Sequence, residues 1–171
     1  MHVEVGAWSG RSYPRGAVVV GFNGKAHSRT AVAWAAQEAA RRGRPLVVVY
    51  AANYSGMTGP PGRGLHHRDP GALEAAEEVT ARGVAAALVA CPDVVVAGAT
   101  EVTPAVRALV EASRDAALVV VGSRGRGRVA RALLGSVSAR VEAEAVSPVA
   151  VVTAAAGSRP FRALVPAWIE A

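Results

Sequence analysis

The sequence predicts an α/β protein with a doubly wound, five-stranded parallel sheet in the order 3-2-1-4-5 and helices on both faces. First, short apolar runs alternate with longer alanine-rich stretches, which is the pattern of parallel strands joined by helices. Second, 51% of the 171 residues are hydrophobic but only 5% are aromatic, which favours a core of valine and alanine. Right-handed crossovers then leave few possible topologies.

The predicted strands are valine-rich runs of six to eight residues bounded by turn residues, which is typical of buried strands. They cover residues 17–22, 45–51, 93–99, 116–121 and 147–154. In a sheet of this order, the strand order reverses between the first and the fourth strand. Ligands of such folds bind outside the carboxyl ends of the strands at that point. The two loops that follow these strands are therefore the first place to look for function.

Each predicted helix begins at a capping residue or a proline, as helix N-termini commonly do. These starts are Ser28, Asp69 with Pro70, Thr103 with Pro104, and Ser136. The first helix is expected to end at Gly43, because glycine is the commonest residue just beyond a helix C-terminus. Pro92 stops the second helix, since proline cannot continue the helical hydrogen bonding.

We divide the chain into an N-terminal tail (1–14), one domain (15–154) and a C-terminal tail (155–171). No apolar run approaches the roughly 18 residues of a membrane span, and residues 1–16 lack the pattern of a signal peptide. Cys91 is the single cysteine, so an internal disulfide is excluded and the cytoplasm is the expected location. The adjacent His66 and His67 have no further ligands nearby, and no metal site is predicted.

The loop after the fourth strand reads GSRGRGRVARALLGSVS and has the composition of an anion-binding loop. Gly122, Gly125 and Gly127 leave backbone N–H groups unshielded, so that they can turn toward an anion. Gly135 then leads into the N-terminus of the last helix, whose exposed N–H groups favour a phosphate. The hydroxyls of Ser136 and Ser138 can donate to phosphate oxygens; Ser136 is also an ordinary helix cap.

Two common phosphate motifs do not fit this loop. A Walker A loop requires a lysine, and the loop has none. A dinucleotide fingerprint over residues 125–130 would follow the fourth strand instead of the first. The spacing Gly122-x2-Gly125-x9-Gly135-Ser136 instead resembles the ATP-binding signature of the universal stress protein family. The first strand and helix, the second strand and the final SPVAVV are similar to that family as well, so that the resemblance covers residues 15–153.

The resemblance implies that ATP is bound, with or without Mg²⁺, by residues of the glycine loop and of the neighbouring strand ends. The expected nucleotide-binding residues are Asn23, Ala51, Gly122, Gly125, Gly127, Gly135, Ser136, Val137 and Ser138. Ala51 would line the adenine pocket through its backbone. Family members also commonly dimerise by pairing their fifth strands, which here points to a homodimer through Val149–Val152; an apolar edge strand invites such pairing.

The sequence departs from the family pattern at two places. Asn23 stands where the family usually has an aspartate near the adenosine, so the hydrogen-bonding side chain is kept but the carboxylate is lost. The loop also carries four arginines, Arg124, Arg126, Arg128 and Arg131. Guanidinium groups suit phosphate oxygens, and they also occur as solvated surface, so both interpretations remain open for these arginines.

The function that these features favour is an ATP-binding stress-response or regulatory module with slow or no hydrolysis and an unidentified protein partner. No catalytic residue is predicted, because Glu142 and Glu144 lie more than a turn into the last helix. One alternative is an enzyme that cleaves adenine nucleotides or transfers AMP, but the motifs of such enzymes are missing after the first strand. The other is nucleic-acid binding. The net charge of +6 favours it, but the aromatic stacking residues that such binding uses are missing near the arginines.

Overall fold

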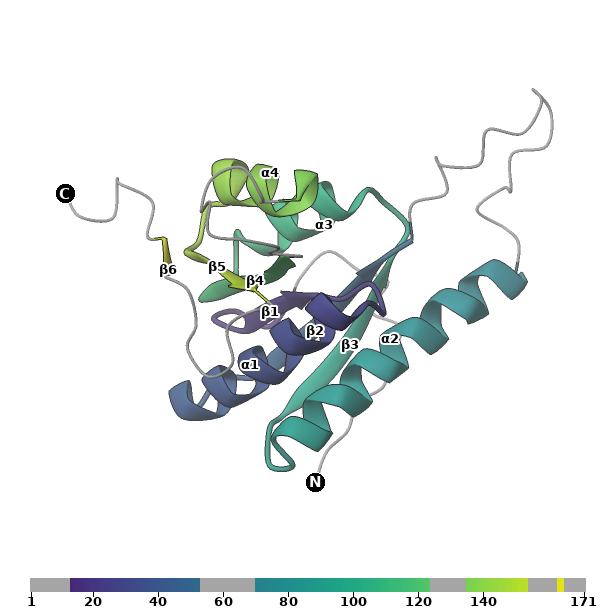
Figure 1. Cartoon of the computed structure of the whole chain (residues 1–171), viewed down its shortest axis with the longest axis horizontal. Coiled ribbons are helices and arrows are strands. Elements are labelled where there is room, and N and C mark those ends of the chain that lie inside the picture. The colour runs from purple at the N-terminus through teal and green to yellow at the C-terminus, as the bar shows by residue number, and fades with distance from the viewer. Residues whose placement is uncertain (1–12, 53–69, 124–134, 154–162, 165–171) are drawn as a thin grey trace.

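The computed structural model describes residues 13–52, 70–123 and 135–153, and a short strand at residues 163–164. Strands and helices alternate along these segments (Figure 1). In chain order they are β1 (Val18–Gly21), α1 (Ala26–Arg42), β2 (Leu46–Ala51), α2 (Pro70–Ala90), β3 (Val96–Glu101), α3 (Ala105–Ala112), β4 (Leu118–Ser123), α4 (Ser136–Glu144), β5 (Val149–Thr153) and β6 (Ala163–Leu164). The predicted alternation of strands and helices is confirmed.

The described strands form one sheet in the order β3-β2-β1-β4-β5-β6. The first five are parallel, as predicted, and β1 is flanked by β2 and β4 in matching register. The sixth strand is an addition that the sequence did not predict. It pairs antiparallel with β5, placing Leu164 opposite Val149 and Ala163 opposite Ala150, and it belongs to the segment expected to be a tail.

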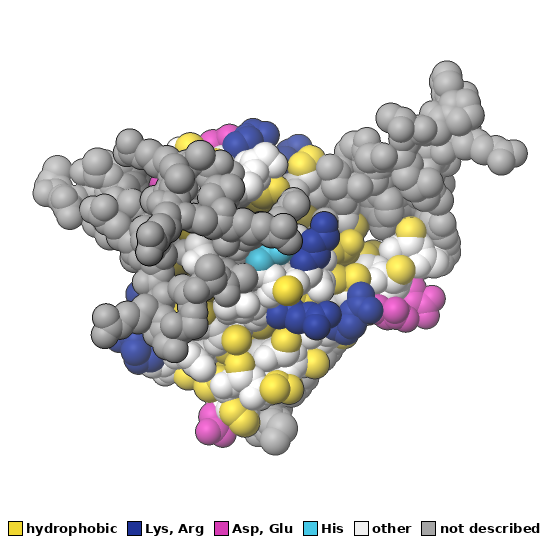
Figure 2. All heavy atoms as spheres, in the orientation of Figure 1, with side chains coloured by type: hydrophobic (Ala, Val, Ile, Leu, Met, Phe, Trp, Pro, Cys, Tyr) yellow, Lys and Arg dark blue, Asp and Glu magenta, His cyan; other side chains and the backbone are white. Residues whose placement is uncertain are grey.

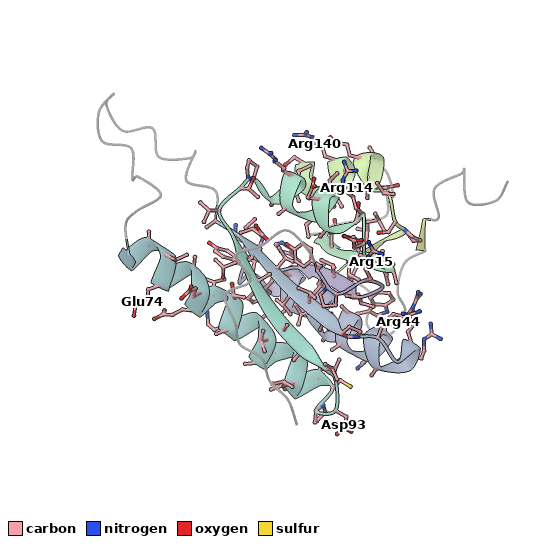
Figure 3. The ribbon with its side chains drawn as sticks, turned by 180° about the vertical axis from the view of Figure 1, so that it is seen from behind. Arg15, Arg44, Glu74, Asp93, Arg114 and Arg140 are labelled. Atoms are coloured by element: carbon pink, nitrogen blue, oxygen red, sulfur yellow. The ribbon has the colours of Figure 1, made fainter. Side chains whose placement is uncertain are left out.

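Alternating residues of the strands build one apolar core on each face of the sheet. In β1, Val18 and Val20 point toward α1 and α2, whereas Val19 points toward α3 and α4. Figure 1 shows the same layering, with α1 and α2 on one side of the sheet and α3 and α4 on the other. Figure 3 shows charged residues such as Arg44 and Asp93 at the periphery, pointing away from the sheet. The apolar runs are thus buried on both sides, as a parallel sheet requires.

The start of α1 differs from the prediction that Ser28 caps it. The helix begins at Ala26 with Lys25 in the N-cap position, so Ser28 lies in the first turn. The Ser28 hydroxyl is buried and donates to the Lys25 carbonyl over 2.8 Å. At the other end, Gly43 has a φ of 60° and its N–H bonds the carbonyls of Ala39 and Ala40, which confirms the predicted stop.

The residues before β1 pack on the α3 side of the sheet. Tyr13 contacts the apolar core there, and its hydroxyl donates to a carboxylate oxygen of Glu101 at the end of β3 over 2.8 Å. Burial of the ring, followed by this bond to a carboxylate, raises the pKa of Tyr13 well above its ordinary value. The tyrosine therefore stays neutral and links the segment before β1 to the end of β3.

Candidate functional site

A cavity of about 160 Å³ opens at the carboxyl ends of β1 and β4, where the strand order reverses. It has room for more than an isolated water molecule. Most of the residues predicted to bind nucleotide line it: Asn23, Ala51, Gly122, Gly135, Ser136, Val137 and Ser138. Gly125, Gly127 and the loop arginines lie outside the described residues. The candidates that the structure describes thus lie around one cavity.

The N-terminus of α4 forms one wall of the cavity. Gly135 is its N-cap residue, so the cap position itself supplies no side-chain hydrogen bond to the free N–H groups of the first turn. The Ser138 hydroxyl is buried and donates to the Gly135 carbonyl over 3.0 Å, so it supports the turn from within. Ser136 and Val137 are exposed. The wall therefore offers backbone donors and the positive end of a helix dipole.

Neither backbone conformation nor crowding by the described residues requires a glycine at position 135. Its φ is −57°, which any residue adopts. Among the described residues, a Cβ added there would meet only the Ser138 hydroxyl, at 3.9 Å. The described part of the chain thus leaves open space beside the N–H groups of α4, which fits a group bound from outside, such as a phosphate.

Gly122, at the end of β4, is a glycine for a different reason. A Cβ at this position would lie 2.5 Å from the His27 carbonyl oxygen and 3.1 Å from the Ser28 nitrogen. The first turn of α1 therefore rests directly on the backbone of β4. This glycine permits a close approach of two backbones, and that approach fixes where the α1 side of the cavity lies.

Asn23 organises the turn between β1 and α1. Its Oδ1 accepts from the Lys25 N–H over 3.1 Å, which makes an Asx turn, and lies 2.9 Å from the Ser28 hydroxyl. Its Nδ2 faces Nε2 of His27 at 3.4 Å. The oxygen is thus engaged inside the turn, and the side chain presents its amide N–H groups outward.

The sequence analysis missed several residues of the cavity wall. His27 and Ser28 come from the first turn of α1, Ser123 from the end of β4, and Leu109 from α3. His27 could have been found by placing the helix start correctly, because a helix beginning at Ala26 brings its first turn to the edge of the sheet where the glycine loop begins.

The described wall of the cavity carries no carboxylate. Within the described ranges, no group of three or more histidine, cysteine, aspartate or glutamate side chains is arranged to hold a metal ion. None of the helices in the described part of the chain is long and apolar enough to cross a membrane. The site as described is thus neutral to basic, with hydroxyl groups and backbone N–H groups as its donors.

These features define a doubly wound α/β protein with a ligand-sized cavity at its switch point. The family model of the universal stress protein family matches residues 15–153. The chain therefore belongs to the universal stress protein family. A universal stress protein of Mycobacterium tuberculosis is 38% identical over 140 residues, which is 79% of this chain and 47% of the relative. The chain thus spans about half the length of the curated relatives it matches.

Two solved structures are similar over most of the chain. A universal stress protein crystallised in complex with cAMP is 28% identical, with a TM-score of 0.62, and the match covers 82% of this chain and 98% of that one. A universal stress protein from Archaeoglobus fulgidus is 23% identical, with a TM-score of 0.62, over 80% of this chain and 97% of the other. Both likenesses support the fold described above.

Proposed function

We propose that the protein binds ATP or a related adenine nucleotide in the cavity between β1 and β4, and that it acts as a stress-response or regulatory module with slow or no hydrolysis. The observation that carries this proposal is the space that the described residues leave open at Gly135, beside the N-terminus of α4 and inside a cavity at the switch point. The structure complexed with cAMP supports an adenine nucleotide as the ligand class.

The described residues suit the parts of such a ligand. The N–H groups at the start of α4 and the Ser136 hydroxyl would hold phosphate oxygens. Ala51, at the end of β2, and Leu109 offer apolar surface for a base. Mg²⁺, if it accompanies ATP, would be held mainly by the phosphates, because the described wall offers it no carboxylate. The described wall likewise offers no carboxylate as a general base for hydrolysis.

Two further features belong to this proposal. The chain forms a homodimer through the edge of β5 at Val149–Val152, where Val151 and Val152 have no partner in β6. It resides in the cytoplasm, where nucleoside triphosphates are available. Figure 1 shows β5 and β6 at one border of the sheet, so a second copy would extend the sheet there.

The test is to release any bound nucleotide from the purified protein with acid, to identify it by chromatography, and to measure thermal shifts with added ATP. Wild type should release adenine nucleotide or be stabilised by ATP. Gly135→Asp should do neither, because its carboxylate fills the space at α4 and repels phosphate. Ala81→Asp adds the same charge on the exposed side of α2 and should behave as wild type. An empty wild type without a thermal shift for ATP, AMP or cAMP would refute the proposal.

A further inference from the structure

The described lining of the cavity has an apolar half and a polar half. The polar half comes from the turn after β1, the first turn of α1, the end of β4 and the N-terminus of α4. On the face that carries α1, Figure 2 shows lysine and arginine side chains beside the one histidine among the described residues. The apolar half lies on the α3 side of the sheet and consists of Val49, Ala51, Ala105, Leu109 and Val121. A ligand with one anionic and one apolar end therefore has a favourable direction in this cavity.

Gly21 makes a notch in the floor of the apolar half. It ends β1 and lies between two valines of the neighbouring strands: Val49 is its register partner in β2, and Val121 lies at the same level in β4. Both valines are buried in the core on the α3 side. Because side chains alternate along a strand, position 21 faces the same side as Val19. The row of side chains facing α3 is thus interrupted at its centre.

Leu109 of α3 occupies this notch. A Cβ added to Gly21 would lie 3.0 Å from Leu109 Cδ1, 3.6 Å from Cδ2 and 3.9 Å from Cγ, so the end of the leucine side chain lies over the glycine. Leu109 is only 3% exposed, yet it lines the cavity. The leucine is therefore a core residue under α3 and, at the same time, a wall that the apolar part of a ligand would meet.

We propose that Leu109, seated on Gly21, sets the depth of the apolar half and so limits the size of the base that the cavity accepts. This rests on the proposed function, since it concerns the same cavity. With the phosphate at α4, the adenine edge farthest from the ribose, which carries the N6 amino group, enters deepest into the apolar half. A bulky group on that nitrogen would meet Leu109, and a closely packed wall rejects such a group by shape.

The experiment measures the affinities of cAMP and of N6-benzyl-cAMP by calorimetry. Both probes carry the same phosphate charge, so the ratio of their affinities reports on the base. For wild type, we expect N6-benzyl-cAMP to bind at least about tenfold more weakly, an effect of the size of one overpacked contact. Leu109→Ala should bind N6-benzyl-cAMP more tightly than cAMP, because the space of the leucine side chain receives the benzyl group. Equal binding of both probes by wild type, or the wild-type ratio in Leu109→Ala, would overturn the proposal.

Gly21→Ala tests the same contact from the sheet. The added methyl group displaces Leu109 from the floor and narrows the cavity, so cAMP should bind about fivefold more weakly than to wild type. When Leu109→Ala is already present, the methyl group enters an empty notch, and adding Gly21→Ala should leave the cAMP affinity unchanged. Losses of affinity that simply add in the double variant would show that the two residues do not act together, and would overturn the proposal.

Two further variants separate the shape of the cavity from the stability of the core. Leu109→Val removes less packing than alanine does, and should shift the ratio in the same direction by a smaller amount. Leu118→Ala is the matched control, because it truncates a buried leucine at the opposite end of β4, in the core on the α1 side, and should keep the wild-type ratio. A ratio that shifts equally in Leu118→Ala would assign the effect to a loosened core and overturn the proposal.

The same measurements keep this proposal distinct from the proposed function. If wild type binds neither cAMP nor ATP, the proposed function fails, and the role of Leu109 in choosing the base fails with it. If wild type binds cAMP and the ratio is the same in every variant, only the role of Leu109 is overturned.

Discussion

Two glycines of the glycine loop, Gly122 and Gly135, line the same cavity for different physical reasons. Gly122 lies against the backbone of α1, and a Cβ there would overlap the His27 carbonyl oxygen at 2.5 Å. Gly135 borders space that the described residues leave open, and its φ of −57° is available to any residue. One residue therefore serves the fold and the other leaves room for a ligand, although the sequence pattern treats them alike.

Gly122→Ala should destabilise the protein by about 3 kcal/mol, because the added methyl group forces α1 away from β4 and neither backbone can yield cheaply. The measurement is the free energy of unfolding in urea, compared with wild type. A stability within roughly 0.5 kcal/mol of wild type, the level of a neutral surface change, would contradict the packing role of this glycine.

Gly135→Ala is the matched substitution at the cavity. It should cost at most about 1 kcal/mol, the size of an N-cap preference. It should nevertheless weaken binding of ATP or cAMP, since the methyl group enters the space beside the N–H groups of α4. Unchanged nucleotide affinity together with unchanged stability would show that a ligand does not use this space.

At this scale the sequence predicted which residues at the two described ends of the glycine loop line the cavity, and it missed the α1 side of the cavity. Gly135, Ser136 and Ser138 were found because glycine spacing and a helix N-terminus leave a readable pattern. His27 left none, because its position depends on a helix that starts at Ala26, and that start is set by Asn23 bonding to Lys25. The Asx turn made by Asn23 starts the helix earlier than the serine cap that the sequence favours would start it.

Among the helices, α1 is fixed at its C-terminal end by an ion-pair cluster. Glu38 accepts from Arg41 through two bonds of 2.7 and 2.8 Å, and from Arg42 over 2.6 Å. Its side chain is only 13% exposed. The hydrogen bonds from Arg41, and then the one from Arg42, lower the pKa of Glu38 to about 2, against the opposing effect of burial. The charged carboxylate is thus favoured in the folded state.

Glu38→Gln should therefore lower the free energy of unfolding by about 1 kcal/mol at pH 7. The folded-state pKa lies below the ordinary value, so the contribution is complete above about pH 4.5 and is lost as the pH falls toward 2. Urea titrations at several pH values should show the difference between wild type and variant shrinking in that range. Glu144→Gln, which breaks the more exposed pair with Arg140, is the control and should change stability less. A difference that stays constant with pH would contradict the role of the Glu38 charge.

The elements themselves were largely predictable, because buried parallel strands read as unbroken apolar runs. The residues at which the strands start were less predictable. Strand β3 begins at Val96 instead of Asp93, because a turn follows Cys91 and Val95 remains exposed. The two-residue β6 was not predictable at all. A strand of that length has no periodicity to recognise, and its place is set by the edge of β5 to which it pairs.

For the molecule as a whole, the sheet order and its two-sided core followed from the alternation of strands and helices. What did not follow is how the border at β5 is used. The sequence offered Val149–Val152 as an edge for a second copy, and the structure pairs Val149 and Ala150 with the chain's own β6. Both kinds of pairing would use the same backbone groups of β5.

A chain that ends at Thr153 should therefore dimerise more strongly than the full chain, with a dissociation constant lower by at least about tenfold. In the full chain, a second copy must displace β6 from β5, so the hydrogen bonds of the new pairing only replace those that are lost. In the shortened chain, every hydrogen bond of the new pairing counts toward the dimer. Sedimentation equilibrium of both forms over a range of concentrations measures this. A variant with proline in place of Ala163 removes one N–H group from β6 within the full chain, and should lie between the two. The same dissociation constant for all three would show that β6 and the second copy do not compete.

The pairing of β6 with β5 also sets a threshold for self-association. A strand tethered to the sheet it covers has an effective concentration on the order of millimolar, whereas a separate copy in solution is present at micromolar levels. The tethered strand therefore starts with a roughly thousandfold advantage for the edge. A second copy would overcome it only by burying surface beyond the strand itself, so a dimer through this edge would depend on side-chain contacts between whole domains.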